Sequence, residues 1–119
     1  MKTILIVDDQ PGIRLLLDEV FSLEGFRTIT AGNGKEALRK AEEAQPDMVL
    51  LDMKMPGMDG IEILKRLKKA QKDLKVMMMT AYGELDLIEE SITCGAVRYF
   101  TKPFDVFEVR DAVKCLLED

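Results

Sequence analysis

Five side chains that could take part in chemistry lie at the ends of predicted strands. They are Asp8 and Asp9 after the first strand, Asp52 at the end of the third, Thr80 at the end of the fourth and Lys102 just beyond the fifth. The runs before Asp8 and Asp52 are continuously apolar and too short for free-standing helices, which is typical of strands buried on both faces of a sheet. Because the carboxyl ends of parallel strands meet at one edge, we expect the five side chains to converge there.

Three carboxylates at one edge repel one another, so they need a nearby cation or a raised pKa. A ligand set of oxygens alone favours a hard ion, and an incomplete cage with room for water and phosphate oxygens favours Mg²⁺ over Ca²⁺. A carboxylate nucleophile, a divalent cation, a lysine and a hydroxyl donor are together what formation of an aspartyl phosphate needs. The pattern therefore predicts phosphoryl transfer to a carboxylate.

The sequence contains no histidine. Ser-His-Asp and Cys-His catalysis, His-ligated zinc and a histidine-borne phosphoryl group are therefore excluded within this chain. Any phosphohistidine in the reaction has to come from a partner protein.

Length and composition indicate one domain. The 119 residues fit a single core, and the 47% hydrophobic and 33% charged fractions are those of a globular protein in water. The net charge of −5 offers no broad basic surface, so we expect neither a nucleic-acid partner nor a membrane partner. There is no signal-peptide pattern and no apolar run of about 18 residues, so we expect a cytoplasmic location. Cys94 and Cys115 lack metal or redox spacing, and we expect reduced, half-buried thiols.

Strand and helix patterns alternate along the chain. The strands are expected at 3–7, 27–31, 48–52, 76–80 and 97–101, and a helical pattern follows each of them. The first helix has the apolar stripe Ile13, Leu16, Leu17, Val20 and Phe21, and the fourth has the spine Leu85, Ile88 and Ile92. Capping boxes are expected at Asp59 with Glu62 and at Asp105 with Glu108. The basic run at 65–69 is expected to be a solvated helix face.

This alternation predicts an α/β fold, a doubly wound (βα)5 parallel sheet with helices on both faces. The first, third and fourth strands are uniformly apolar and belong inside, whereas the second and fifth are mixed and belong at the edges. The strand order 2-1-3-4-5 satisfies this requirement. A flavodoxin-like mononucleotide-binding protein has the same order, but it needs hydroxyls and amides after the first strand, where this chain has Asp8 and Asp9. Tight FMN uptake without Mg²⁺ would favour that alternative.

Four segments, ILIVDDQ, VLLDMKMPGMDG, MTAYGELD and YFTKPF, resemble the receiver domains of two-component response regulators, over essentially the whole chain. The resemblance implies a single receiver domain over residues 1–119, without an effector domain. It makes Asp52 the phosphoacceptor and places Thr80 and Lys102 on the phosphoryl group. Tyr99 matches the aromatic switch position, although the best-known receivers of sporulation phosphorelays are expected to have histidine there, and Lys102–Pro103 matches the family's cis peptide.

The resemblance also implies a metal site and its ligands. Asp9, Asp52 and the backbone carbonyl of Lys54 would bind Mg²⁺, or Mn²⁺ in its place, with Asp8 acting through water. The long Lys54 side chain could also shield the acyl phosphate from water. The alternative is that Lys54 is an ordinary solvated surface lysine without this role.

Within the family the likeness is strongest to stand-alone receivers of sporulation phosphorelays, through MPGMDGIEILKR, MTAYGELD and KPFD with EVRDAVK. Such receivers accept phosphate from sensor histidine kinases and donate it to a histidine phosphotransferase, and aspartyl-phosphate phosphatases are further expected partners. They are phosphoryl carriers rather than classical turnover enzymes. The implied docking surface comprises Gln10, Gly12, Ile13, Leu16, Lys54, Tyr82, Pro103 and Phe104.

Two other functions remain open at this point. A chemotaxis-type receiver would bind a target when phosphorylated, without onward transfer, and a receiver fragment could belong to a DNA-binding regulator. The pocket chemistry does not distinguish the relay carrier from the chemotaxis-type receiver, so only the resemblance separates these two.

Overall fold

The computed structural model describes residues 1–55, 57–81 and 85–117. Its main sheet has five parallel strands in the order β2-β1-β3-β6-β7. These strands are β1 (Thr3–Val7), β2 (Arg27–Ala31), β3 (Met48–Asp52), β6 (Lys75–Ala81) and β7 (Arg98–Lys102). The predicted order 2-1-3-4-5 is confirmed, with β6 and β7 as the fourth and fifth strands.

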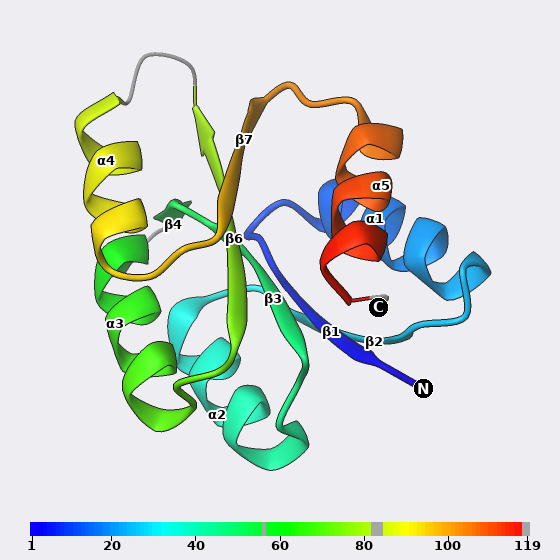
Figure 1. The fold of residues 1–119 in the computed structure, drawn as a ribbon, viewed down its shortest axis with the longest axis horizontal. Helices are drawn as coiled ribbons and strands as arrows, with labels where there is room; N and C mark the ends of the chain where they lie inside the picture. The colour runs from blue at the N-terminus through cyan, green and yellow to red at the C-terminus, as the bar shows by residue number, and fades with distance from the viewer. Residues whose placement is uncertain (56, 82–84, 118–119) are drawn as a thin grey trace.

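Helices cover both faces of this sheet (Figure 1). They are α1 (Pro11–Leu23), α2 (Gly34–Ala44), α3 (Gly60–Ala70), α4 (Leu85–Thr93) and α5 (Val106–Leu117). In Figure 1, α1 and α5 lie on one side, and α2, α3 and α4 lie on the other. The doubly wound α/β prediction is therefore confirmed.

The central strands supply both hydrophobic layers by alternation. Leu5 and Leu51 belong to the cluster that includes the α2 and α3 side chains, whereas Ile4 and Leu50 belong to the cluster with α1 and α5. All the residues of β1 and β3 are buried, which explains why these strands read as continuous apolar runs. This rigid centre holds the carboxyl ends of β1 and β3 side by side.

Helix α4 faces the core differently from the prediction. Ile88 is buried, but Leu85 is 68% exposed and Ile92 is 46% exposed. The inward residues are Ile88 and Ser91, and the Ser91 hydroxyl donates to the Ile88 carbonyl. The helix is thus rotated relative to the predicted spine, because packing against the sheet, rather than sequence periodicity, sets the rotation.

Smaller expectations also need correction. Leu16 was expected on the apolar stripe of α1 but is 41% exposed. The fully buried residues of this helix are Leu17 and Phe21. Cys94 is half-buried as expected, but Cys115 is exposed.

The predicted capping boxes are replaced by simpler caps. The Asp59 carboxylate accepts from the Ile61 amide. Glu62 forms an ion pair with Arg66 instead of accepting from the Asp59 amide, as a capping box would require. Asp105 likewise accepts from the Phe107 amide. Each carboxylate therefore bonds one residue earlier than a capping box requires.

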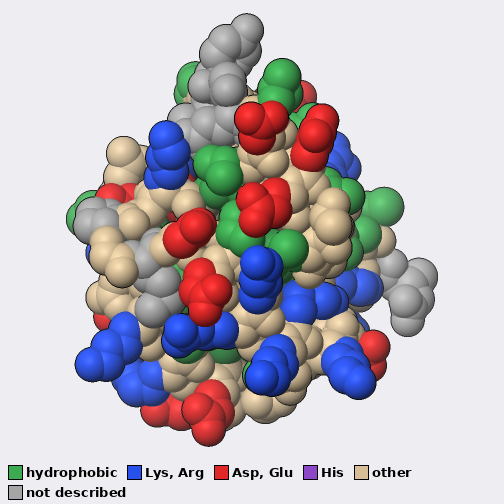
Figure 2. Space-filling model, turned by 90° about the vertical axis from the view of Figure 1, so that its left-hand side faces the viewer, with side chains coloured by type: hydrophobic (Ala, Val, Ile, Leu, Met, Phe, Trp, Pro, Cys, Tyr) green, Lys and Arg blue, Asp and Glu red, His purple; other side chains and the backbone are tan. Residues whose placement is uncertain are grey.

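The basic run of α3 is solvated as predicted, with Lys65, Arg66 and Lys69 exposed. Figure 2 shows Lys and Arg side chains gathered over the lower half of the face that carries α2, α3 and α4. Lys68 is half-buried and donates to the carbonyls of Lys72 and Leu74 beyond the helix end. Within the described residues, no helix has the length and apolar character needed to cross a membrane.

Candidate functional site

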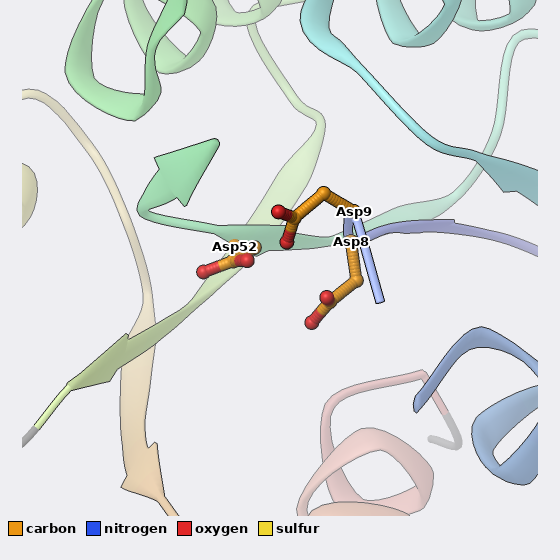
Figure 3. Close-up of side chains that lie close together, drawn as sticks. All are labelled: Asp8, Asp9 and Asp52. Atoms are coloured by element: carbon orange, nitrogen blue, oxygen red, sulfur yellow. The ribbon is translucent and has the colours of Figure 1, made fainter. Parts of the chain in front are cut away.

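The carboxyl ends of β1 and β3 bring three carboxylates together. Asp8 and Asp9 directly follow β1, and Asp52 is the last residue of β3, whose register pairs Leu51 with Val7. One carboxylate oxygen from each of the three residues lies within 4.8 Å of the others. Figure 3 shows the three side chains leaving the strand ends toward a common space. The predicted convergence of these residues therefore occurs.

Asp8 is buried and fixed at both carboxylate oxygens. Its Oδ1 accepts from the Gln10 amide at 2.9 Å, and its Oδ2 accepts from Lys102 Nζ at 2.7 Å. Asp9 is exposed, and its carboxylate makes no hydrogen bond or ion pair within the described part of the chain. The pair thus combines one anchored carboxylate with one that faces solvent.

Lys102, at the end of β7, connects two of the carboxylates. Its Nζ lies 2.7 Å from Asp8 Oδ2 and 3.3 Å from Asp52 Oδ2. Burial lowers the pKa of Lys102, but the hydrogen bond to Asp8 and the charges of Asp52 and Asp8 outweigh burial, so its pKa is raised. The lysine therefore stays charged, yet one ammonium does not neutralise three carboxylates.

Asp52 is only 5% exposed, and its Oδ1 accepts from the Lys54 amide at 3.3 Å. Burial and the negative charge of Asp8 raise the pKa of Asp52 from 3.8 to about 6, although Lys102 opposes the shift. At neutral pH the Asp52 carboxylate is mostly ionised, and Lys102 only partly offsets the free-energy cost of holding this charge in a buried position next to Asp8. An additional cation at this position would relieve that cost.

Thr80 on β6 has an unsatisfied hydroxyl. It is fully buried, and its Oγ1 has no hydrogen-bond partner among the described residues. It follows Met79, which pairs in register with Asp52. Leaving a buried hydroxyl unpaired costs roughly 1–3 kcal/mol. A ligand oxygen beside Asp52 would supply the missing partner.

A short hairpin shapes the loop after Asp52, which the sequence did not predict. Strand β4 (Lys54–Met55) pairs antiparallel with β5 (Met58–Asp59). The loop is tied down because the Met53 amide donates to the Met79 carbonyl at 2.9 Å and the Gly60 amide donates to the Met53 carbonyl at 3.2 Å. A Cβ at Gly60 would lie 2.6 Å from the Met53 carbonyl oxygen, so the close approach requires glycine.

Most of the expected docking residues surround one groove. An open groove of about 350 Å³ beside the carboxylates is lined by Gln10, Ile13, Leu16, Lys102, Pro103 and Phe104. Gly12 lies exposed in the first turn of α1, and Lys54 is exposed on β4, outside the groove lining. Tyr82 lies outside the described residues.

Two further expectations concern β7 and the loop that follows it. Tyr99 is 42% exposed on β7, two strands from Asp52. The Lys102–Pro103 peptide bond is cis, as the resemblance implied.

Arg14 is a residue near the site that the sequence analysis missed. Its Nη1 donates to the Asp8 carbonyl at 2.6 Å. The available signal was the basic residue in the first turns of α1, six positions after Asp8, but this bond from an arginine side chain to a main-chain carbonyl has no sequence motif.

The family model described as the response regulator receiver domain matches residues 4–114. The chain belongs to this family. Sporulation initiation phosphotransferase F of Bacillus subtilis (strain 168) is similar to this receiver domain, with 61% identity over 95% of this chain and 91% of that protein.

Solved structures agree with this assignment. A CheY-like response regulator receiver domain protein from Methanospirillum hungatei JF-1 superposes with a TM-score of 0.95 at 31% identity, covering 99% of this chain and 94% of that one. The response regulator TrrA from Thermotoga maritima, solved in complex with Mg²⁺-BeF, has a TM-score of 0.86 at 43% identity, covering 98% of this chain and 100% of that one. The receiver fold and a role in two-component signalling follow.

Proposed function

We propose that this receiver domain is a phosphorelay intermediate that carries a phosphoryl group on Asp52. The observation that carries the proposal is the convergence of the Asp8, Asp9 and Asp52 carboxylates with Lys102. The residue after the register partner of Asp52, Thr80, adds a buried hydroxyl without a hydrogen-bond partner among the described residues. Because the chain has no histidine, the histidines that would donate and accept the phosphoryl group in such a relay belong to partner proteins.

The residues have distinct roles in the transfer step. An Asp52 carboxylate oxygen attacks the phosphorus of a partner's phosphohistidine, so that a P–O bond forms while the P–N bond breaks. The imidazole leaves with the electron pair of that bond and takes up a proton. Lys102 places positive charge next to the phosphoryl oxygens, and Thr80 donates its hydroxyl to one of them. Tyr99 is proposed as the aromatic side chain that reorients together with Thr80.

The donor set fits a hard divalent cation. The three carboxylates offer only oxygen, their combined charge exceeds that of Lys102, and the Thr80 hydroxyl lacks a partner. Asp9, Asp52 and the Lys54 carbonyl would hold Mg²⁺, or Mn²⁺ in its place, with Asp8 acting through water. When bound, the ion supplies positive charge that offsets charge on the phosphoryl oxygens.

Onward transfer is supported by the 61% identity to a sporulation initiation phosphotransferase matched over 91% of its length. We propose that the chain acts as a stand-alone receiver in such a relay, with a sensor histidine kinase as donor and a histidine phosphotransferase as acceptor. The groove lined by Ile13, Leu16 and Phe104 lies beside the carboxylates, which suits a partner helix that presents a histidine to Asp52. Aspartyl-phosphate phosphatases would approach the same groove, which Gln10 and Pro103 also line. We propose Gly12, Lys54 and Tyr82 as further docking residues outside the groove lining.

Transfer of label tests this function. Asp52 is loaded with labelled phosphate from a histidine kinase in the presence of Mg²⁺, and a purified histidine phosphotransferase is then added. Movement of the label onto the phosphotransferase is expected, and Asp52→Asn should prevent loading. Loss of the label only to water would contradict the relay, and persistent labelling of Asp52→Asn would remove Asp52 from its role.

A second candidate is a receiver that binds a target without passing phosphate on. It is favoured by the exposure of Leu85, Ile92 and Tyr99 on α4 and β7, away from the groove beside α1. Such apolar exposure suits a protein partner. Failure of onward transfer together with phosphate-dependent binding of a target would support this candidate.

A further inference from the structure

The main chain of Asp8 is anchored as firmly as its side chain. The Asp8 amide donates to the Ala31 carbonyl at 3.1 Å, and the Asp8 carbonyl accepts from Arg14 Nη1 at 2.6 Å. Among the residues that the structure describes, Arg14 is the one side chain that bonds the main chain of Asp8. It reaches this carbonyl from α1, whereas the other contacts come from the strand ends and the Gln10 amide.

The bond to Arg14 also acts on the next residue. The Asp8 carbonyl and the Asp9 amide belong to one planar peptide unit, so holding the carbonyl fixes the rotation of that plane. The Asp9 side chain makes no polar contact of its own within the described part of the chain. The peptide plane therefore sets the position of the Asp9 backbone from which the carboxylate extends toward Asp8 and Asp52.

The surroundings of Arg14 are built for this contact. The Arg14 amide donates to the Gln10 carbonyl at 3.2 Å, which sets the residue in the first turns of α1. A Cβ at Gly32 would lie only 3.1 Å from Arg14 Nη1, so the guanidinium occupies space left by the missing side chain. In the part of the chain that the structure describes, Arg14 forms no ion pair, and its hydrogen bond goes to a neutral carbonyl.

We infer that Arg14 is a positioning residue for the cation site: its guanidinium holds the Asp8–Asp9 peptide so that the Asp9 carboxylate joins Asp8 and Asp52. The inference rests on the proposed function, because it concerns the residues expected to hold Mg²⁺. It adds a residue that touches neither the ion nor the phosphoryl group.

Two effects of Arg14 on cation binding have opposite signs. As a positive charge near the site it repels a cation, so its removal would tighten binding. As a positioning residue it keeps a ligand in place, so its removal weakens binding by about fivefold to tenfold, as expected for the loss of one hydrogen bond to a ligand-bearing peptide. The direction of the change therefore separates the two roles.

The test measures Mg²⁺ affinity by titration calorimetry in Arg14→Met, Gly32→Ala and Lys40→Met. Lys40 is a matched control because its Nζ donates to the Thr30 carbonyl at 2.6 Å, which is the same kind of bond on the neighbouring strand. We expect weaker binding in Arg14→Met, a smaller loss in Gly32→Ala and a change below about twofold in Lys40→Met. Equal or tighter binding in Arg14→Met would overturn the inference.

A second measurement is independent of metal. The residual dipolar coupling of the Asp9 amide in the metal-free protein reports the orientation of the peptide plane, and it should change in Arg14→Met but not in Lys40→Met. An unchanged coupling in Arg14→Met would also overturn the inference. If the unaltered protein binds no Mg²⁺, the proposed function is contradicted instead, whereas normal binding with an unaffected Arg14→Met contradicts the positioning role alone.

Discussion

Lys102 Nζ lies 2.7 Å from Asp8 Oδ2, although β7, which contains Lys102, and β1, which Asp8 directly follows, are separated in the sheet by β3 and β6. The long lysine side chain thus spans the site at the carboxyl edge and reaches Asp52 as well, at 3.3 Å. One ammonium is shared between two carboxylates, so its removal should affect both.

Lys102→Ala is expected to slow loading of Asp52 from a small phosphodonor by about 100-fold, because the phosphoryl oxygens lose a preorganised positive charge. The pKa of Asp52 should also rise, since Lys102 lowers it. Phosphorylation kinetics and the ¹³C shift of the Asp52 carboxyl carbon measure the two effects. Lys114→Ala, which removes a lysine far from the site on α5, serves as control, and equal rates in the two variants would contradict the role of Lys102.

Asp52→Asn should stabilise the metal-free protein at neutral pH. The folded pKa of Asp52 is about 6, against 3.8 ordinarily, so ionisation favours the unfolded chain above pH 6. The penalty grows between pH 3.8 and about 6 and is absent below that window. We expect a gain of about 1–2 kcal/mol in the free energy of unfolding at pH 7.5, after allowance for solvent screening at the open site.

Urea denaturation at several pH values measures this gain. The exposed Asp73→Asn provides the matched loss of one carboxylate outside the site. A gain for Asp52→Asn that is as large at pH 3.5 as at pH 7.5 would show that ionisation is not its cause.

Mg²⁺ should stabilise the folded protein and lower the apparent pKa of Asp52, because the ion binds the ionised carboxylates. At a concentration 100 times the dissociation constant the gain is about 2.7 kcal/mol, and a chelator should reverse it. Thermal unfolding with and without Mg²⁺ measures the effect. Asp9→Asn should reduce it while leaving the metal-free melting temperature nearly unchanged, and a full Mg²⁺ effect in Asp9→Asn would exclude Asp9 as a ligand.

Gly60→Ala should destabilise the protein by about 1–3 kcal/mol, because the new Cβ collides with the main chain of Met53 rather than with a flexible side chain. The same collision displaces the loop after Asp52, so loading should slow as well. Gly12→Ala is the control, since a Cβ at Gly12 meets nothing within 4 Å. Similar unfolding midpoints for the two variants would argue against a tight loop.

Lys54→Ser tests whether the exposed Lys54 side chain shields the acyl phosphate from water. Hydrolysis of phosphorylated Asp52 should become faster by roughly threefold to tenfold, about 1 kcal/mol in the barrier. Release of labelled phosphate measures it. Lys65→Ser, at an exposed position on α3, should leave the rate unchanged, and the same rate in Lys54→Ser would refute the shielding.

The sequence was most informative where backbone geometry alone determines position. Apolar β1 and β3 had to be central strands, and parallel pairing then had to place Asp8 next to Asp52. The rotation of α4 about its axis could not be predicted from the sequence. Ile88 belongs both to the predicted apolar face and to the face that is buried, and the contacts with the sheet decide which face turns inward.

Two other features left no periodic signal. The β4–β5 hairpin has strands of two residues each, too short for alternation to be visible. The bond from Arg14 to the Asp8 carbonyl depends on the space above Gly32, which exists only once the loops after β1 and β2 are folded together.

The bond from Lys40 to the Thr30 carbonyl affects how copies of this protein meet. Because the Ala31 carbonyl accepts from the Asp8 amide just beyond β1, the preceding carbonyl of Thr30 points away from β1, toward the open side of the sheet. A charged lysine therefore occupies an acceptor that a strand from another molecule would need for pairing. Strand addition at β2 is therefore disfavoured, which lowers the tendency of two copies to pair their sheets along this edge.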